Sequence, residues 1–159
     1  MNRKKLMIIV AAVLVVAIIA SIFIFFGPGD FRRAKWGMSI RQVKARESLE
    51  LKNETSDSLV YALPELEGVK FDSLVFYKFD TSSDELTQIN IGINATSFED
   101  KLIKKIINKF EEKYGEPDDY EDISSSRNYY WNTNRSKIHI RQIETYVLIT
   151  YMDIEKVAE

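Results

Sequence analysis

LTQINIGIN, residues 86–94, is the stretch that decides the fold class, because apolar and polar residues alternate along it. Ile89, Ile91 and Ile93 lie on one face of a strand with this sequence, and polar residues or glycine occupy the other face. Such alternation predicts a strand that is buried on one side and wet on the other, which is typical of antiparallel sheets. We therefore predict an antiparallel sheet with one covered face.

A helix is predicted directly after this strand. Thr96 and Glu99 have the spacing of a capping box, which opens a helix. Gly115 followed by Pro117 is typical of a helix end. Between these signals, apolar residues recur every three or four positions and form one stripe. The stripe consists of Phe98, Leu102, Ile103, Ile106, Ile107, Phe110 and Tyr114.

The same order of elements is predicted twice along the chain. Ser39 and Gln42 form an earlier capping box, which opens a helix within KWGMSIRQV. Three strand-type runs follow each predicted helix. These runs are 59–63, 73–79 and 86–94 in the first half and 128–132, 137–143 and 146–152 in the second. The sequence thus predicts an α+β fold, a duplicated αβββ-αβββ domain with antiparallel sheet, over residues 36–159.

A long apolar run, LMIIVAAVLVVAIIASIFIFF, precedes this domain at residues 6–26. As a helix it is roughly 31 Å long, which is close to the thickness of the hydrocarbon core of a bilayer. The run predicts a single-pass membrane protein with a signal-anchor. Its parts are a short cytoplasmic tail (1–5), a transmembrane helix (6–26), a juxtamembrane linker (27–35) and an extracytoplasmic domain (36–159).

The alternative to an anchor is a cleaved secretory signal peptide, because three basic residues precede the apolar run. The run is longer than the apolar part of a signal peptide, and no small-x-small cleavage site precedes Gly27. Basic residues flank the run on both sides, so charge barely decides its orientation. The short tail favours a cytoplasmic N-terminus, which places the domain outside the cell membrane and fits a bacterial cell envelope.

Charge excludes nucleic acid as a partner. Residues 1–35 hold six of the 22 basic residues and one of the 24 acidic residues, so residues 36–159 have a net charge of −7. An acidic domain without a basic stripe is a poor binder of phosphate. The chain contains no cysteine, so it forms no disulfide and offers no thiolate.

Catalytic and metal-binding signatures are missing from the sequence. It contains no G-x-S-x-G, H-E-x-x-H, P-loop or G-x-G-x-x-G motif, and its one histidine, His139, is expected on the wet face of a strand. The acidic cluster at residues 116–122 lacks the turn glycine and closing glutamate of a calcium loop. We therefore predict no catalytic residue, no metal site and no cofactor, and we expect that the protein is not an enzyme.

Two segments, WGMSIRQV and FEEKYGEP, carry a resemblance to known proteins. A tryptophan-glycine-x-serine helix start and a KYG-x-P helix end, followed by a tryptophan strand, resemble outer-membrane assembly lipoproteins of the SmpA/OmlA type and the β-lactamase-inhibitor-protein fold. The matching residues are Trp36, Gly37, Ser39, Val43, Tyr114, Gly115, Pro117 and Trp131. The resemblance implies α-plus-β-meander units and a non-enzymatic adaptor or inhibitor. The chain departs from the lipoprotein pattern because it has no cysteine to lipidate.

Aromatic residues are the candidate interaction surface. Eight Tyr and two Trp are present, and these residues are favoured interface anchors because they combine apolar area with a polar tip. The candidates are Tyr129, Trp131 and Tyr146, and core packing is the alternative role for each of them.

The function predicted from these features is a membrane-anchored, non-enzymatic binding or adaptor domain that acts on another cell-envelope protein. The alternative is an extracytoplasmic domain that binds or senses a small ligand. That alternative predicts a sizeable apolar pocket between the helices and the sheet. An enzyme would require a cleft with clustered titratable groups.

Overall fold

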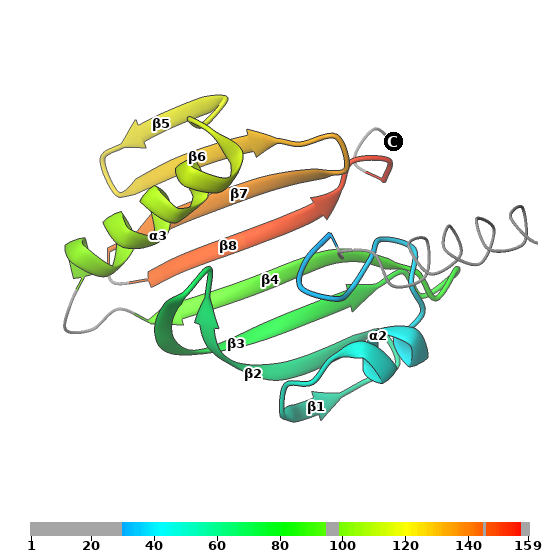
Figure 1. The fold of residues 1–159 in the computed structure, drawn as a ribbon. Helices are drawn as coiled ribbons and strands as arrows, with labels where there is room; N and C mark the ends of the chain where they lie inside the picture. The colour runs from blue at the N-terminus through cyan, green and yellow to red at the C-terminus, as the bar shows by residue number, and fades with distance from the viewer. Residues whose placement is uncertain (1–29, 95–98, 145, 157–159) are drawn as a thin grey trace, which may run out of the picture.

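The computed structural model describes residues 30–94, 99–144 and 146–156 (Figure 1). Two helices are described, α2 (Ile40–Arg46) and α3 (Glu99–Tyr114). The strands of the first half are β1 (Leu51–Glu54), β2 (Ser58–Leu66), β3 (Val69–Phe79) and β4 (Leu86–Asn94). Those of the second half are β5 (Asp119–Ile123), β6 (Ser126–Asn132), β7 (Ser136–Ile143) and β8 (Tyr146–Asp153).

All eight strands form one antiparallel sheet in the order β1-β2-β3-β4-β8-β7-β6-β5. The two halves join at the centre, where β4 pairs with β8 and Ile91 lies opposite Ile149. Helix α3 follows β4 and precedes β5, so the chain passes from the middle of the sheet to its far edge in one step (Figure 1). The edges of the sheet are therefore β1 and β5.

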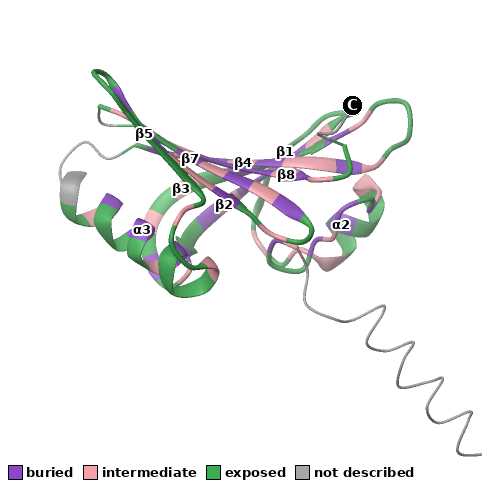
Figure 2. Cartoon of the chain, turned by 90° about the horizontal axis from the view of Figure 1, so that it is seen from above, coloured by how far each residue is buried: buried purple, intermediate pink, exposed green. Residues whose placement is uncertain are grey.

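Both helices lie on the same face of the sheet (Figure 2), which we call the helix face. The centre of this face is completely buried. Ile89, Ile91, Ile149 and Tyr151 are each at most 1% exposed. Helix α3 covers the second half with the predicted stripe, in which Phe110 is fully buried. Burial of each such side chain stabilises the fold by about 1.5–3 kcal/mol.

Residues 30–38, the N-terminal segment, also lie on the helix face. The ring of Phe31 is 5.0 Å from that of Tyr151, measured between centroids, and 6.1 Å from that of Tyr77. The indole N–H of Trp36 donates a 2.9 Å hydrogen bond to Ser136 Oγ on β7. The segment thus belongs to the core and ties together the two halves of the sheet.

The predicted duplicated αβββ-αβββ domain is wrong. Four strands follow each described helix, and they form a single, mostly β structure with one continuous sheet. The edge strands β1 and β5 were missed because all of their residues are exposed, so they show no alternation of apolar and polar positions. The six predicted strands lie within β2, β3, β4, β6, β7 and β8. Thr96, the predicted start of the second helix, lies outside the described residues.

The structure also contradicts the predicted single-pass location in a cell membrane. Across residues 30–94, 99–144 and 146–156, no helix is long and apolar enough to cross a bilayer. Helix α2 has seven residues, and the sixteen residues of α3 include a charged face. The predicted transmembrane helix, 6–26, lies outside the described residues. The predicted integral membrane location and extracytoplasmic side are corrected accordingly, because no described helix supports them.

Candidate functional site

The candidate site is the face of the sheet opposite the helix face, which we call the open face. Neither helix lies over it (Figure 2). Residues paired across antiparallel strands share a face, so the register gives rows of neighbouring side chains. One row across the middle of the open face is Phe76, Asn90, Thr150, His139 and Tyr130.

Large apolar side chains are exposed on this face. Leu74, Phe76 and Tyr146 are 39%, 36% and 42% exposed. Leu148, which is half-buried, lies in the same row as Leu74, with only Gly92 between them. These side chains (Leu74, Phe76, Tyr146 and Leu148) form what we call the apolar patch.

A polar cluster adjoins the apolar patch on β6 and β7. The rings of His139 and Tyr130 are stacked, 4.5 Å apart at an interplanar angle of 11°. His139 Nε2 is 3.1 Å from Asn128 Oδ1. Because an amide oxygen only accepts hydrogen bonds, Nε2 carries the proton and donates. Burial, and then the positive charge of Arg141, lower the pKa of His139 below its ordinary value of 6.5, so the ring is neutral at pH 7.

Hydrogen bonds between side chains hold the centre of the open face. Thr150 Oγ1 donates to Asn90 Oδ1 at 3.1 Å, and Gln88 Nε2 donates to the same oxygen at 2.9 Å. These residues belong to the two central strands, β4 and β8. The polar middle of the face is therefore fixed before any partner arrives.

Basic side chains share the open face with the apolar patch. Arg141 lies beside Leu148, and Lys78 and Lys137 stand at opposite ends of one row that crosses β4 and β8. None of these three bases forms an ion pair with another described residue. Acidic residues gather instead at the β5 edge, where Tyr130 Oη donates to Glu121 at 3.3 Å.

The predicted candidates Tyr129, Trp131 and Tyr146 do not come together. Tyr146 lies on the open face, and the other two lie on the helix face. Trp131 is 2% exposed, donates a 2.9 Å hydrogen bond from Nε1 to the carbonyl of Gly115, and packs against Phe110. Tyr129 is half-buried, with its ring 6.3 Å from that of Trp131.

Sequence reasoning missed Leu74 and Phe76. The available signal was the run LVFY at residues 74–77, which places apolar side chains on both faces of β3. An antiparallel strand with one wet face is expected to alternate. Apolar residues on both faces of β3 therefore distinguish it from a strand with one wet face and make the open face a candidate contact surface.

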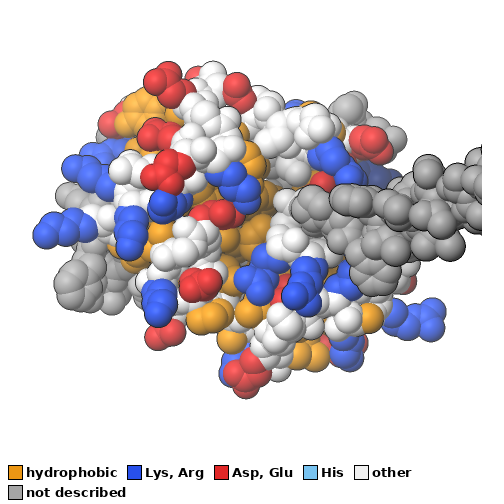
Figure 3. All heavy atoms as spheres, in the orientation of Figure 1, with side chains coloured by type: hydrophobic (Ala, Val, Ile, Leu, Met, Phe, Trp, Pro, Cys, Tyr) orange, Lys and Arg blue, Asp and Glu red, His pale blue; other side chains and the backbone are white. Residues whose placement is uncertain are grey.

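Two hollows on the helix face flank Arg135. The larger, about 320 Å³, lies between α3 and the N-terminal segment, and Figure 3 shows apolar side chains framed by charged ones in this part of the surface. The other is about 210 Å³ and is lined mainly by polar groups. The larger hollow reaches the lower end of the size range of ligand pockets, and most of its lining residues are polar or charged. Within the described ranges, no three His, Cys, Asp or Glu residues are grouped as metal ligands.

Comparison with known proteins leaves the function open. The sequence matches no protein-family model and no curated protein. A solved structure with some similarity is YjgB, a DUF4309 family protein from Bacillus subtilis, with a TM-score of 0.40 and 10% sequence identity. The similarity covers 72% of this chain and 78% of that chain. At this level it transfers neither fold nor function.

Proposed function

We propose that this protein is a non-enzymatic binding domain that presents its open face to a partner protein. The observation that carries the proposal is the apolar patch, in which Leu74, Phe76 and Tyr146 are exposed together on a face that neither helix covers. Contiguous exposed apolar side chains with a polar surround mark protein interaction sites. Phe76 and Tyr146 would be the main anchors, because aromatic side chains supply large contact area with few rotatable bonds.

The bases on the open face indicate the chemistry of the partner. Lys78, Lys137 and Arg141 stand on the open face without ion-pair partners among the described residues, although residues 36–159 are acidic as a whole. A partner that places carboxylates on these bases and apolar side chains on the patch would match the face in charge and polarity. We therefore expect a protein partner with an acidic rim around an apolar contact.

The polar cluster supports binding rather than catalysis. A histidine that acts as a general base needs a reacting group within hydrogen-bond reach and commonly a carboxylate that orients it. His139 instead contacts the amide of Asn128 and the ring of Tyr130. This is the geometry of a packed surface histidine.

The first test is crosslinking and co-purification of tagged full-length protein from its native cells. Variants Phe76→Ser and Tyr146→Ala remove the anchors of the open face. Tyr120→Ala is the matched control, because Tyr120 is 47% exposed but lies on the helix face. We expect one protein to be recovered with wild type and Tyr120→Ala and to be lost with both open-face variants.

A photo-crosslinking residue placed at position 76, and separately at position 120, locates the contact. The partner should be crosslinked from position 76 only. Recovery of the same protein by all variants, or crosslinking from position 120 alone, would show that the open face is not the binding surface.

A further inference from the structure

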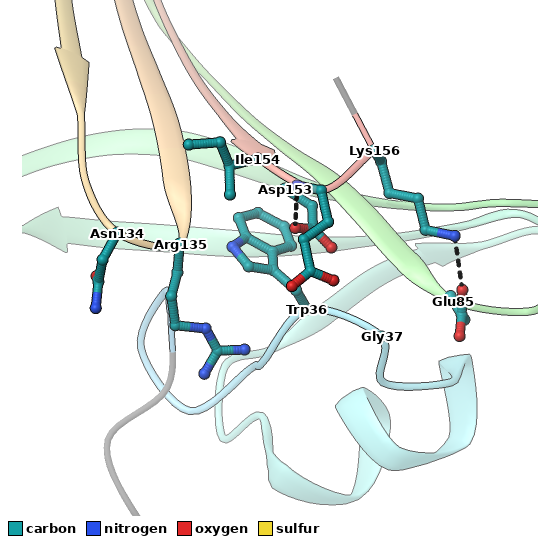
Figure 4. Close-up of a pocket in the computed structure, with 9 residues that line it drawn as sticks. Trp36, Gly37, Glu85, Asn134, Arg135, Asp153, Ile154 and Lys156 are labelled. Atoms are coloured by element: carbon teal, nitrogen blue, oxygen red, sulfur yellow. Dashed lines mark hydrogen bonds and ion pairs between the residues drawn. The ribbon is translucent and has the colours of Figure 1, made fainter. Parts of the chain in front are cut away.

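The smaller hollow of the helix face is a preformed pocket of about 210 Å³ (Figure 4). Trp36 lies at its centre, with Arg135 on one side and Lys156 on the other. The Trp36 ring is fixed by its hydrogen bond to Ser136, and the next residue, Gly37, donates its backbone N–H to the Leu86 carbonyl at 3.1 Å. The wall of the pocket is thus held by the sheet itself.

Both basic residues of the pocket already have acidic partners. Arg135 Nε is 3.1 Å from Asp30 Oδ1. Lys156 Nζ is 3.1 Å from Glu85 Oε2, the ion pair drawn in Figure 4. The positive charges that line the pocket are therefore balanced before any ligand enters.

Two further carboxylates in the pocket have no such balance. Asp153 is 7% exposed, and one of its oxygens accepts the backbone N–H of Glu155 at 3.1 Å. Within the part of the chain that the structure describes, no side chain donates to the other oxygen, and neither Asp153 nor Glu155 forms an ion pair. The other Asp153 oxygen is not among the fully buried atoms without a partner, so it is open to the pocket, where a cation could pair with it.

We propose that this pocket binds a small organic cation through an ammonium or guanidinium group. The cation would lie between the carboxylates of Asp153 and Glu155 and against the ring of Trp36, which attracts cations through its π face. A metal ion fits less well, because no group of three possible ligands is found among the described residues. The ligand is small, because sites for drug-sized molecules measure roughly 300–1,000 Å³.

Isothermal titration calorimetry with putrescine, agmatine and 1,4-butanediol tests the charge requirement. Butanediol is the neutral counterpart of putrescine, with hydroxyls in place of ammonium groups. The full chain would be kept in a non-ionic detergent, because residues 6–26 are strongly apolar. We expect one site for at least one of the two amines, affinity that falls with added salt, and no binding of butanediol. Absence of binding by both amines at millimolar concentration, or equal binding of butanediol, would overturn the proposal.

Variants locate the site. Asp153→Asn and Glu155→Gln should each weaken amine binding at least tenfold. Asp153 is buried, so its substitution could disturb folding. Glu155 is exposed, so Glu155→Gln tests the site without that risk. Glu121→Gln is the matched control, because it removes one carboxylate from the open face. Equal weakening by all three substitutions, or no weakening by Glu155→Gln, would contradict the assignment.

The two tryptophans give an independent readout. Trp36 lies in the pocket, and Trp131 lies under α3 with its N–H bound to Gly115. In an NMR titration, the indole N–H signal of Trp36, assigned with Trp36→Phe, should shift on amine binding while that of Trp131 stays in place. A shift of Trp131 alone would rule out this pocket. Phe76→Ser should leave amine binding unchanged, so this inference and the proposed protein-binding function can fail separately.

Discussion

The hydroxyl of Tyr146 lies over the backbone of Gly92, in the space that a side chain at position 92 would occupy. The contact crosses from β8 to β4 on the open face, where Gly92 pairs with Leu148. Glycine within a strand weakens it and often marks a close approach of another group. Gly92 therefore weakens the strand slightly and leaves room for the hydroxyl end of Tyr146, which belongs to the apolar patch.

This relationship predicts coupling between the two positions. In a Tyr146→Ala background, Gly92→Ala should raise the free energy of unfolding by about 0.5–1 kcal/mol, because alanine restricts the unfolded chain. In the wild-type background the gain should be smaller or reversed, because the new methyl displaces the ring. Urea denaturation of all four proteins measures the coupling as a double-mutant cycle. Equal effects in the two backgrounds would mean that the contact has no energetic consequence.

We expect Trp131 to stabilise the fold rather than to contact a partner. Trp131→Ala should lower the free energy of unfolding by about 3–5 kcal/mol, because it leaves a cavity beside Phe110. Tyr146→Ala should change it by less than about 1 kcal/mol, because Tyr146 is 42% exposed and its removal leaves no enclosed cavity. Denaturant titration with circular dichroism distinguishes the two. A Trp131→Ala protein of normal stability that loses its partner would restore Trp131 as an interface residue.

A hydrogen bond joins the C-cap residue of α2 to the sheet. Tyr77 Oη donates to Glu47 Oε2 at 2.6 Å, and the Glu47 side chain is only 3% exposed, with Arg32 Nε 3.4 Å away. Tyr77→Phe leaves this charged oxygen without its closest donor, so the free energy of unfolding should fall by about 1.5–3 kcal/mol. Tyr61→Phe is the control, because the hydroxyl of Tyr61 is buried without a hydrogen-bond partner among the described residues. Equal losses in both variants would show that ring packing, rather than the hydrogen bond, is responsible.

The same tyrosine predicts a loss of stability in alkali. Burial, and then the neighbouring Glu47 carboxylate, raise the pKa of Tyr77 far above its ordinary value of 10.0. Above about pH 10 the unfolded chain releases a proton that the native chain keeps, so the free energy of unfolding falls as pH rises. Tyr77→Phe should make this fall shallower between pH 9 and 11 in urea titrations. An unchanged slope would show that other groups cause it.

The lowered pKa of His139 predicts that the free energy of unfolding also falls in mild acid. Its pKa is lowered in the native state, chiefly by burial, so below about pH 6.5 the unfolded chain binds a proton that the native chain does not. The free energy of unfolding should therefore fall as pH drops from 7.5 to 5.5, and less steeply in His139→Gln, whose amide can still donate to Asn128. If the variant and wild type lose stability equally, groups other than His139 cause the acid sensitivity.

The spacing of apolar residues predicted helices and strands correctly wherever one side of the element is buried. The alternation of β4 and the stripe of α3 arise because burial selects apolar residues at the period of the strand or the helix. The predicted capping box of Ser39 and Gln42 is confirmed, with both of its hydrogen bonds present. The edge strands β1 and β5 carry no such pattern, because water reaches both of their faces.

The sequence by itself determined the antiparallel character of the strands, the covered face of β4 and the start of α2, because each depends on neighbours a few residues away. The tertiary structure alone decided that β4 pairs with β8, which makes one sheet of the two halves. It also decided that Trp131 is covered by α3 while Tyr146 stays exposed, and that Trp36 and Asp153 share a pocket. These outcomes depend on contacts between residues far apart in the chain. Such contacts produce no periodic pattern of apolar residues in the sequence of either segment.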